Sequence, residues 1–210
     1  MAQPKAVIFD LGGVVMGSPL HAIAAYERAV AIPSGFVNRH VVATGAPGAW
    51  SRLERGEVSL DAFYPLFDAE CEAAGYTVSA RAMMERIAVE AQPRPRMLAA
   101  IRSIRARGLR TAALTNNWIA DGTRERDWLG DVFEVVVESA LEGIRKPDPR
   151  IYQIALKRLG VAATETVFLD DIGRNLKPAR ALGMITIKVE SEGQALGDLS
   201  QALGFALDDA

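Results

Sequence analysis

The stretch AVIFDLGGVV at residues 6–15 decides the fold of this chain. It begins as an apolar run with β-branched residues and ends at a pair of glycines, which predicts a buried parallel strand followed by a tight turn. Asp10 stands where that strand ends. Because ligands of open α/β sheets bind at the carboxyl edge of the strands, this carboxylate is a candidate for chemistry, although alone it would equally serve as a turn cap.

Composition limits what the protein does. The chain has 210 residues, half of them hydrophobic, which suffices for one core and a sizeable insertion. A formal net charge of -2 predicts neither a nucleic-acid nor an anionic membrane partner. No apolar run approaches the roughly 18 residues of a spanning helix, and no leader is recognisable. The single cysteine, Cys71, indicates a structural thiol in a reducing compartment. We expect a cytoplasmic protein with a small-molecule partner and leave its oligomeric state open.

The pattern divides the chain into two parts. Residues 17–93 carry apolar side chains at helical spacing, and Ser59 is placed to begin one of the helices. We expect a helical insertion there, flanked by a core made of residues 1–16 and 94–210. The aromatic residues of the insertion would form its own core or line a substrate pocket; they are Trp50, Phe63, Tyr64 and Phe67.

After residue 94, apolar strands alternate with amphipathic helices. Strands are expected at residues 110–114, 134–137, 166–169 and 185–189, with helices at 150–159 and up to 182. We expect a short linker at residues 191–197, which contain glycine and serine. This alternation predicts an α/β fold with a doubly wound, Rossmann-like parallel sheet.

Polar residues gather at the ends of the expected strands. Right-handed crossovers bring all these ends to one edge, so residues distant in sequence converge there. The set is Asp10, Thr115, Asn116, Lys146, Asp170, Asp171 and Asn175. Carboxylates suit Mg²⁺, the hydroxyl and the ammonium suit an anionic group, and a carboxylate beside a metal and a lysine can form an aspartyl-phosphate. Taken singly, Lys146 would also fit a structural ion pair, and the paired aspartates a helix cap.

Four motifs, at residues 9–14, 114–116, 146–149 and 168–171, resemble those of the haloacid dehalogenase superfamily, most of whose members are Mg²⁺-dependent phosphohydrolases. Residues 115–118, 124–126 and 168–180 are most similar to the N-terminal phosphatase domain of soluble epoxide hydrolases, as is the insertion at 52–58. The resemblance implies that residues 17–93 are a C1-type cap that closes over the substrate. Since the sequence has no epoxide hydrolase domain, we expect no epoxide chemistry.

The resemblance also implies roles for the site residues. Asp10 would be the nucleophile that attacks phosphorus, and Lys146 would neutralise the charge of the nucleophile and the phosphate. Thr115 and Asn116 would hold the phosphoryl oxygens. The expected reaction is hydrolysis of a small phosphorylated metabolite.

The implied cofactor is Mg²⁺. By the resemblance, Asp171 would ligate it together with Asp10 and the main-chain carbonyl of Gly12. Asp170 and Asn175 would support the metal and its waters.

One departure from the family pattern concerns Gly12, which stands where most phosphatases of this superfamily carry a general acid/base aspartate. Such a group contributes typically 10²- to 10⁴-fold in rate. Three hypotheses follow: the leaving group needs little protonation, a residue of the cap such as His21 substitutes, or the domain binds a phosphorylated ligand with little turnover. A metal-free 2-haloacid dehalogenase is a further alternative, against which the acidic Asp170-Asp171 pair stands.

Overall fold

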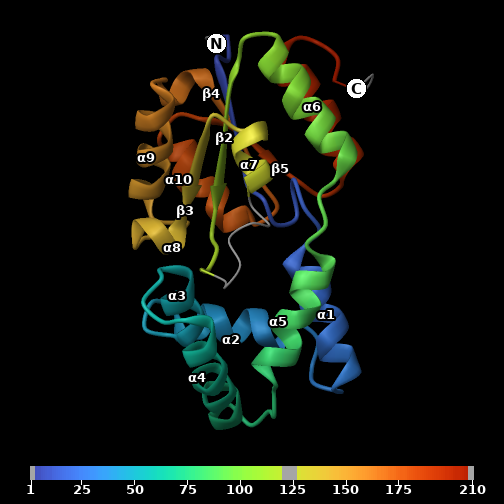
Figure 1. Cartoon of the computed structure of the whole chain (residues 1–210), viewed down its shortest axis with the longest axis vertical. Helices are drawn as coiled ribbons and strands as arrows, with labels where there is room; N and C mark the ends of the chain where they lie inside the picture. Colours follow the sequence, from blue (N-terminus) through green and yellow to red (C-terminus); the bar gives the residue numbers. More distant parts are fainter. Residues whose placement is uncertain (1–2, 120–126, 208–210) are drawn as a thin grey trace.

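The computed structural model describes residues 3–119 and 127–207, and these form two lobes stacked along the long axis (Figure 1). One lobe contains a parallel sheet with helices on both faces, and the other contains helices only. Residues 124–126, which contributed to the family resemblance, lie outside the described part of the chain. The α/β class and the doubly wound sheet expected from the sequence are confirmed.

The sheet places the strand that carries Asp10 at its centre. The strand order is β3-β2-β1-β4-β5, and all neighbours are parallel. The strands are β1 (Ala6–Phe9), β2 (Arg110–Thr115), β3 (Val135–Glu138), β4 (Thr166–Asp170) and β5 (Ile185–Lys188). Because the chain continues from β1 to one side and later returns to the other, the strand order reverses at β1. A ligand site is expected beyond such a point.

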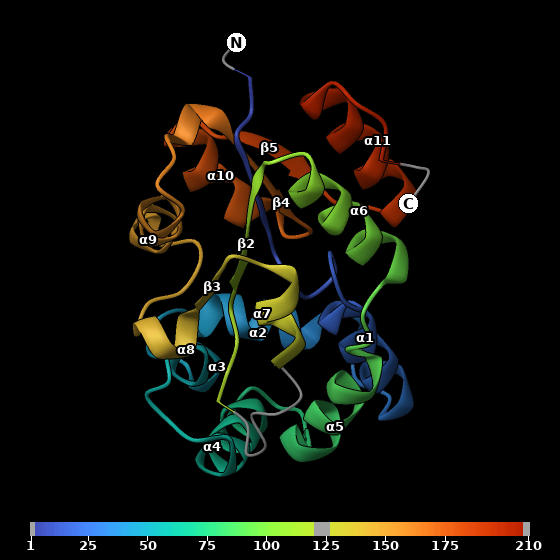
Figure 2. The same ribbon diagram turned by 45° about the horizontal axis from the view of Figure 1, so that its top comes forward.

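Alternation along β1 builds two separate hydrophobic layers. Val7 and Phe9 pack on one face of the sheet, whereas Ala6 and Ile8 pack on the other. The first face is covered by α6 (Pro95–Ala106), α7 (Asp127–Val132) and α11 (Glu192–Leu203), and the second by α9 (Pro149–Leu159) and α10 (Gly173–Ala181) (Figure 2). A short helix, α8 (Ser139–Glu142), follows β3 directly. With both faces covered, the accessible chemistry lies at the strand ends.

The prediction of a linker at residues 191–197 is wrong, because these residues form the N-cap and the first turns of helix α11. Ser191 and Gln194 form a reciprocal capping box, in which the Ser191 hydroxyl accepts from the Gln194 main-chain N–H at 3.3 Å. Leu196, Leu199 and Leu203 then bury one face of the helix against the sheet. Glycines in the first two turns hid this apolar spacing.

The second lobe has a hydrophobic core of its own. It consists of α1 (Pro19–Ala29), α2 (Phe36–Thr44), α3 (Ala49–Glu54), α4 (Leu60–Ala73) and α5 (Ala80–Glu90). Phe63 and Phe67 are fully buried in this core, and their ring centroids lie 5.2 Å apart. Ser59 caps α4 as expected, since its hydroxyl accepts from the Ala62 N–H at 3.2 Å. The aromatic residues therefore mainly build the insertion.

Two neighbouring segments connect the lobes. Met16 bridges to Pro93, the Gly17 N–H donates to the Gln92 carbonyl at 3.0 Å, and the Arg94 N–H donates to the Val15 carbonyl at 2.8 Å. These contacts hold the two connecting segments side by side. The limits of residues 17–93 for the cap stay a prediction. Throughout the two described ranges, no helix combines the length and apolar character that crossing a bilayer requires.

Candidate active site

The site lies beyond the carboxyl ends of β1, β2 and β4. Asp10 follows β1 directly, Thr115 ends β2, and Asp170 ends β4. The residues predicted from the sequence that line one common pocket are Asp10, Gly12, Thr115, Asn116, Lys146, Asp171 and Asn175. Asp170 is fully buried behind them. The tertiary structure thus brings the whole predicted set together.

Lys146 connects two of the carboxylates. Its side chain is 1% exposed, and its Nζ lies 2.9 Å from Asp10 Oδ1 and 2.7 Å from Asp170 Oδ2. Burial would by itself lower the pKa of Lys146, but the two carboxylates outweigh it and raise that pKa, so the side chain stays protonated. The ion pair expected as a structural alternative therefore exists, and it places an ammonium inside the pocket.

Asp170 acts as the anchor of this arrangement. Both of its carboxylate oxygens accept from Asn175 Nδ2 at 3.1 Å, and Oδ1 also accepts from the Ile172 N–H at 2.8 Å. The Asn175 carbonyl in turn accepts from the Tyr152 hydroxyl at 2.7 Å. Since these hydrogen bonds fix the carboxylate, they also fix the ammonium of Lys146 that it holds.

The site holds more negative than positive charge. Oxygen atoms of Asp10, Asp170 and Asp171 lie within 4.8 Å of one another. The Lys146 ammonium lies within hydrogen-bonding distance of two of these carboxylates, those of Asp10 and Asp170. Burial and the neighbouring carboxylates raise the pKa of Asp171 to about 6, and burial raises the pKa of Asp10 as well. A side chain on Gly13 would collide with the Asp171 carboxylate, and φ of Gly13 is +78°. The excess charge and oxygen donors fit a hard divalent cation.

Asn116 has its side chain occupied within the protein. Its Oδ1 accepts from the Lys146 N–H at 2.8 Å, and its Nδ2 donates to the Lys146 carbonyl at 3.0 Å. This two-way contact fixes the loop that carries Lys146. What Asn116 could offer a phosphoryl oxygen is therefore its main-chain N–H rather than the side-chain amide.

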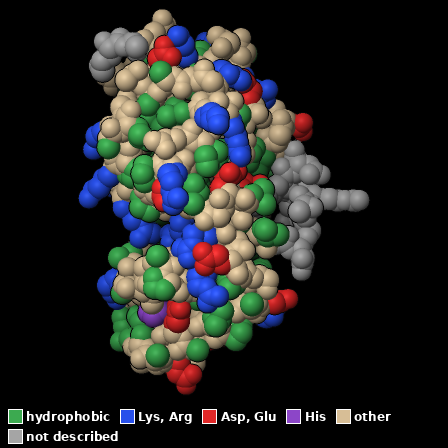
Figure 3. All heavy atoms as spheres, turned by 90° about the vertical axis from the view of Figure 1, so that its left-hand side faces the viewer, with side chains coloured by type: hydrophobic (Ala, Val, Ile, Leu, Met, Phe, Trp, Pro, Cys, Tyr) green, Lys and Arg blue, Asp and Glu red, His purple; other side chains and the backbone are tan. Residues whose placement is uncertain are grey.

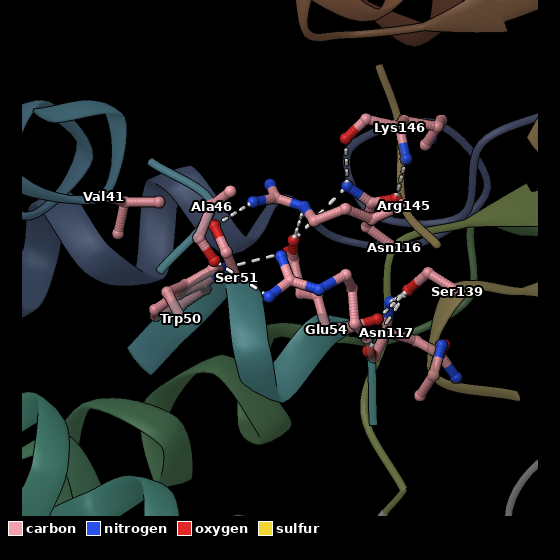
Figure 4. A network of polar contacts seen from close by, with 12 residues as sticks. Val41, Ala46, Trp50, Ser51, Glu54, Asn116, Asn117, Ser139, Arg145 and Lys146 are labelled. Atoms are coloured by element: carbon pink, nitrogen blue, oxygen red, sulfur yellow. Dashed lines mark hydrogen bonds and ion pairs between the residues drawn. The ribbon is translucent and has the colours of Figure 1, made fainter. Parts of the chain in front are cut away.

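Glu54 and Arg145 belong to the pocket but received no role from the sequence (Figure 4). The Glu54 carboxylate accepts from Trp50 Nε1 at 2.9 Å, from Asn116 Nδ2 at 3.4 Å, and pairs with Arg145 Nε at 2.6 Å. Burial raises the pKa of Glu54, and Arg145 partly opposes this. These contacts join α3 of the helical lobe to the core loop beside Lys146. Glu54 lies in a stretch that resembles the family and Arg145 directly precedes another, which was the one available signal.

Gly12 and His21 bear on the missing general acid. A Cβ on Gly12 would lie 3.0 Å from Cδ of Pro19, the first residue of α1, so the space for an aspartate side chain is partly taken. His21 is exposed and is not among the pocket-lining residues. The structure therefore gives His21 no position from which to replace the acid.

The helical lobe supplies an apolar wall opposite the charged residues. This wall consists of Pro19, Leu20, Ile23, Val37, Val41 and Trp50. Trp118 of the core joins it. A ligand would therefore meet charge at one end of the pocket and hydrophobic side chains along its body.

Curated relatives cover nearly all of this chain. It is 41% identical over 207 residues to Acyl-CoA dehydrogenase family member 10 of Mus musculus, covering 97% of this chain and 19% of that protein. It is 34% identical to Bifunctional epoxide hydrolase 2 of Sus scrofa, covering 97% of this chain and 39% of that protein. Sesquiterpene phosphatase astK of Aspergillus oryzae is 28% identical, covering 95% of this chain and 97% of that protein. The chain thus spans a minor part of the first two relatives.

Solved structures share the fold. A "predicted HAD-like family hydrolase" from Porphyromonas gingivalis superposes with a TM-score of 0.71 at 21% identity, covering 96% of this chain and 98% of that one. A HAD family enzyme from Bacteroides thetaiotaomicron, in complex with magnesium and inorganic phosphate, gives a TM-score of 0.62 at 22% identity, covering 89% and 94%. The family model "haloacid dehalogenase-like hydrolase" matches residues 4–183. Because this family model covers most of the chain, the chain belongs to the haloacid dehalogenase-like hydrolases.

Proposed function

We propose that this chain is a Mg²⁺-dependent phosphohydrolase that acts on a small phosphorylated metabolite through an aspartyl-phosphate on Asp10. The observation that carries the proposal is the buried Lys146 ammonium, held between Asp10 and Asp170 at the floor of the pocket. An ammonium placed beside a carboxylate nucleophile lowers the repulsion between that nucleophile and an incoming phosphate dianion.

The first step forms a bond between a carboxylate oxygen of Asp10 and phosphorus, while the bond from phosphorus to the ester oxygen breaks. The Thr115 hydroxyl and the Asn116 main-chain N–H are the proposed donors to the phosphoryl oxygens, and Lys146 balances their charge. In the second step a water oxygen bonds to phosphorus and the phosphorus–Asp10 bond breaks. Inorganic phosphate leaves and Asp10 is regenerated as a carboxylate.

The carboxylates fit a bound Mg²⁺, which Asp10, Asp171 and the Gly12 carbonyl would hold, with Asp170 and Asn175 in support. When bound, the metal neutralises phosphoryl charge and lowers the pKa values of its carboxylate ligands. The solved relative with magnesium and phosphate supports this choice of cation. Among the described residues of this site, carboxylates outnumber ammonium groups, which independently supports a bound cation.

The glycine at position 12 shapes the expected substrate. With no carboxyl group there, the departing oxygen takes its proton from solvent, so leaving groups of low pKa react fastest. Acyl phosphates and anomeric sugar phosphates have such leaving groups. The helical lobe would exclude bulk water from the pocket and pack against the body of the substrate. A full-length relative that is named as a phosphatase supports phosphate ester hydrolysis in general.

The test is release of inorganic phosphate by the purified protein from p-nitrophenyl phosphate, acetyl phosphate and a panel of sugar and lipid phosphates. We expect turnover that requires both Mg²⁺ and Asp10. EDTA should abolish the wild-type rate. Asp10→Asn should be inactive, although a cooperative thermal unfolding transition should show that it is folded. Turnover by Asp10→Asn equal to wild type would refute the assignment of the nucleophile. Release of chloride from 2-chloropropionate without Mg²⁺ would instead establish the dehalogenase alternative.

A further inference from the structure

A second hollow, rich in arginine, shares lining residues with the active-site pocket. The hollow lies between α2, α3 and the loop before α9, and its arginines are Arg55, Arg145, Arg150 and Arg174. Arg145 and Arg174 also line the active-site pocket, as does Val41. Figure 3 shows Lys and Arg side chains gathered where the two lobes meet. Arg174 therefore borders both the active-site pocket and this hollow.

Three of these arginines already have carboxylate partners. Arg55 Nε lies 2.6 Å from Glu57 Oε1, and Arg150 Nη2 lies 2.7 Å from Asp148 Oδ2. Arg145 is paired with Glu54 and also donates to the Ser51 hydroxyl at 2.5 Å. Their charges are used within the protein, so they would gain little from a ligand anion.

Arg174 differs from the other three. Within residues 3–119 and 127–207, no side chain or carbonyl forms a hydrogen bond or ion pair with its guanidinium, and its Nε is buried without a partner. A buried donor of this kind costs free energy until an acceptor reaches it. Arg174 thus has donors available at the wall of the pocket.

The surrounding charges favour an added anion. Burial is the main cause of the raised pKa of Glu54 and of the lowered pKa of Arg145. The positive charge of Arg174 opposes the first shift and adds to the second, which places Arg174 near that pair. The guanidinium of Arg174 therefore lies near the Glu54 carboxylate, which is already paired with Arg145. A carboxylate or phosphate group would satisfy the guanidinium of Arg174, whose planar fork matches both.

We propose that Arg174 binds a second anionic group of the substrate, a carboxylate or a second phosphate, while the scissile phosphoryl group lies at Asp10. This inference rests on the proposed function, because it gives the phosphohydrolase a substrate class. The carbon skeleton between the two anionic groups would lie along the apolar wall at Val41. The chain would then select phosphate esters with two separated anionic groups over plain alkyl phosphates.

The experiment compares matched substrates in wild type and Arg174→Gln. The carboxylate arm pairs 3-phosphoglycerate with glycerol 3-phosphate, and the phosphate arm pairs fructose 1,6-bisphosphate with fructose 6-phosphate. Because a charge-assisted hydrogen bond contributes about ten- to hundred-fold, we expect kcat/KM of wild type to favour the doubly anionic member by that factor in one arm. Arg174→Gln should reduce this ratio toward one, mainly through KM, and Arg174→Lys should restore part of it.

Arg150→Gln is the matched control, since Arg150 lines the same hollow but is exposed and paired with Asp148; it should keep the wild-type ratio. Equal ratios in wild type and Arg174→Gln would overturn the proposal, even where p-nitrophenyl phosphate is hydrolysed. Absence of turnover on every substrate would refute the proposed function instead. In that case, titration calorimetry in the presence of Mg²⁺ tests the role of Arg174. Either 3-phosphoglycerate or fructose 1,6-bisphosphate should bind wild type at least about tenfold more tightly than Arg174→Gln, and equal dissociation constants would refute the proposal.

Discussion

Asp171→Asn should stabilise the metal-free protein, although it should abolish the proposed Mg²⁺-dependent release of phosphate. Burial and nearby carboxylates raise the pKa of Asp171 from 3.8 to about 6. That difference corresponds to about 3 kcal/mol at 1.36 kcal/mol per pH unit. In the folded protein the carboxyl group binds its proton more tightly than in the unfolded chain. Stability from this group is therefore complete below about pH 4, falls as the pH rises, and is lost above about pH 6.

Asparagine does not titrate, so the stability of the variant does not fall with pH through residue 171. In EDTA, its free energy of unfolding in urea should match wild type near pH 4 and exceed it by about 3 kcal/mol above pH 7. Mg²⁺ at one thousand times its dissociation constant should reverse the order, because a ligand at that concentration adds about 4.1 kcal/mol to the protein that binds it, which exceeds the advantage of the variant. Equal stability of variant and wild type at pH 8 in EDTA would refute the argument, since it would mean that burial and the neighbouring carboxylates do not disfavour the charged form of Asp171 in the folded state.

Two further predictions concern buried groups. Lys146→Met leaves the Asp10 and Asp170 carboxylates without their ammonium, so phosphate release should be abolished. The free energy of unfolding in urea, measured at pH 8 in EDTA, should fall by about 3–5 kcal/mol. Unchanged stability would contradict the buried ion pairs. Burial raises the pKa of Cys71 to about 12, so at pH 8 only about one thiol in 10⁴ is ionised. Ellman's reagent should leave the native protein unmodified and react at once in urea, whereas rapid modification of the folded protein would show that the thiol is accessible.

Helix α11 shows where the interpretation of local patterns failed. The sequence contains a serine and a glutamine at the spacing of a capping box, and leucines at helical spacing follow them. Glycines at positions 193 and 197 favoured a linker, yet the capping box and the burial of Leu196, Leu199 and Leu203 outweigh their low helix propensity. Helix propensity is a weak signal when an apolar face has a sheet to pack against.

The sequence by itself determined the elements and the main chemical groups. An apolar run that ends in Asp10 and two glycines specifies a strand and a turn, because these patterns act between near neighbours in the chain. The parallel topology then brings the strand ends to one edge, which places Asp10, Thr115 and Asp171 in one pocket. The cluster was predictable because topology alone forces it.

Only the tertiary structure decided what surrounds this cluster. Glu54 of the helical lobe meets Arg145, Pro19 fills the space beside Gly12, and Arg174 lines the pocket with no partner among the described residues. These contacts join residues that are distant in the sequence, so no local pattern specifies which polar side chains meet between the lobes. The carboxylates and the lysine of the cluster are encoded along the chain, whereas the side chains that line the rest of the pocket depend on how the two lobes fit together.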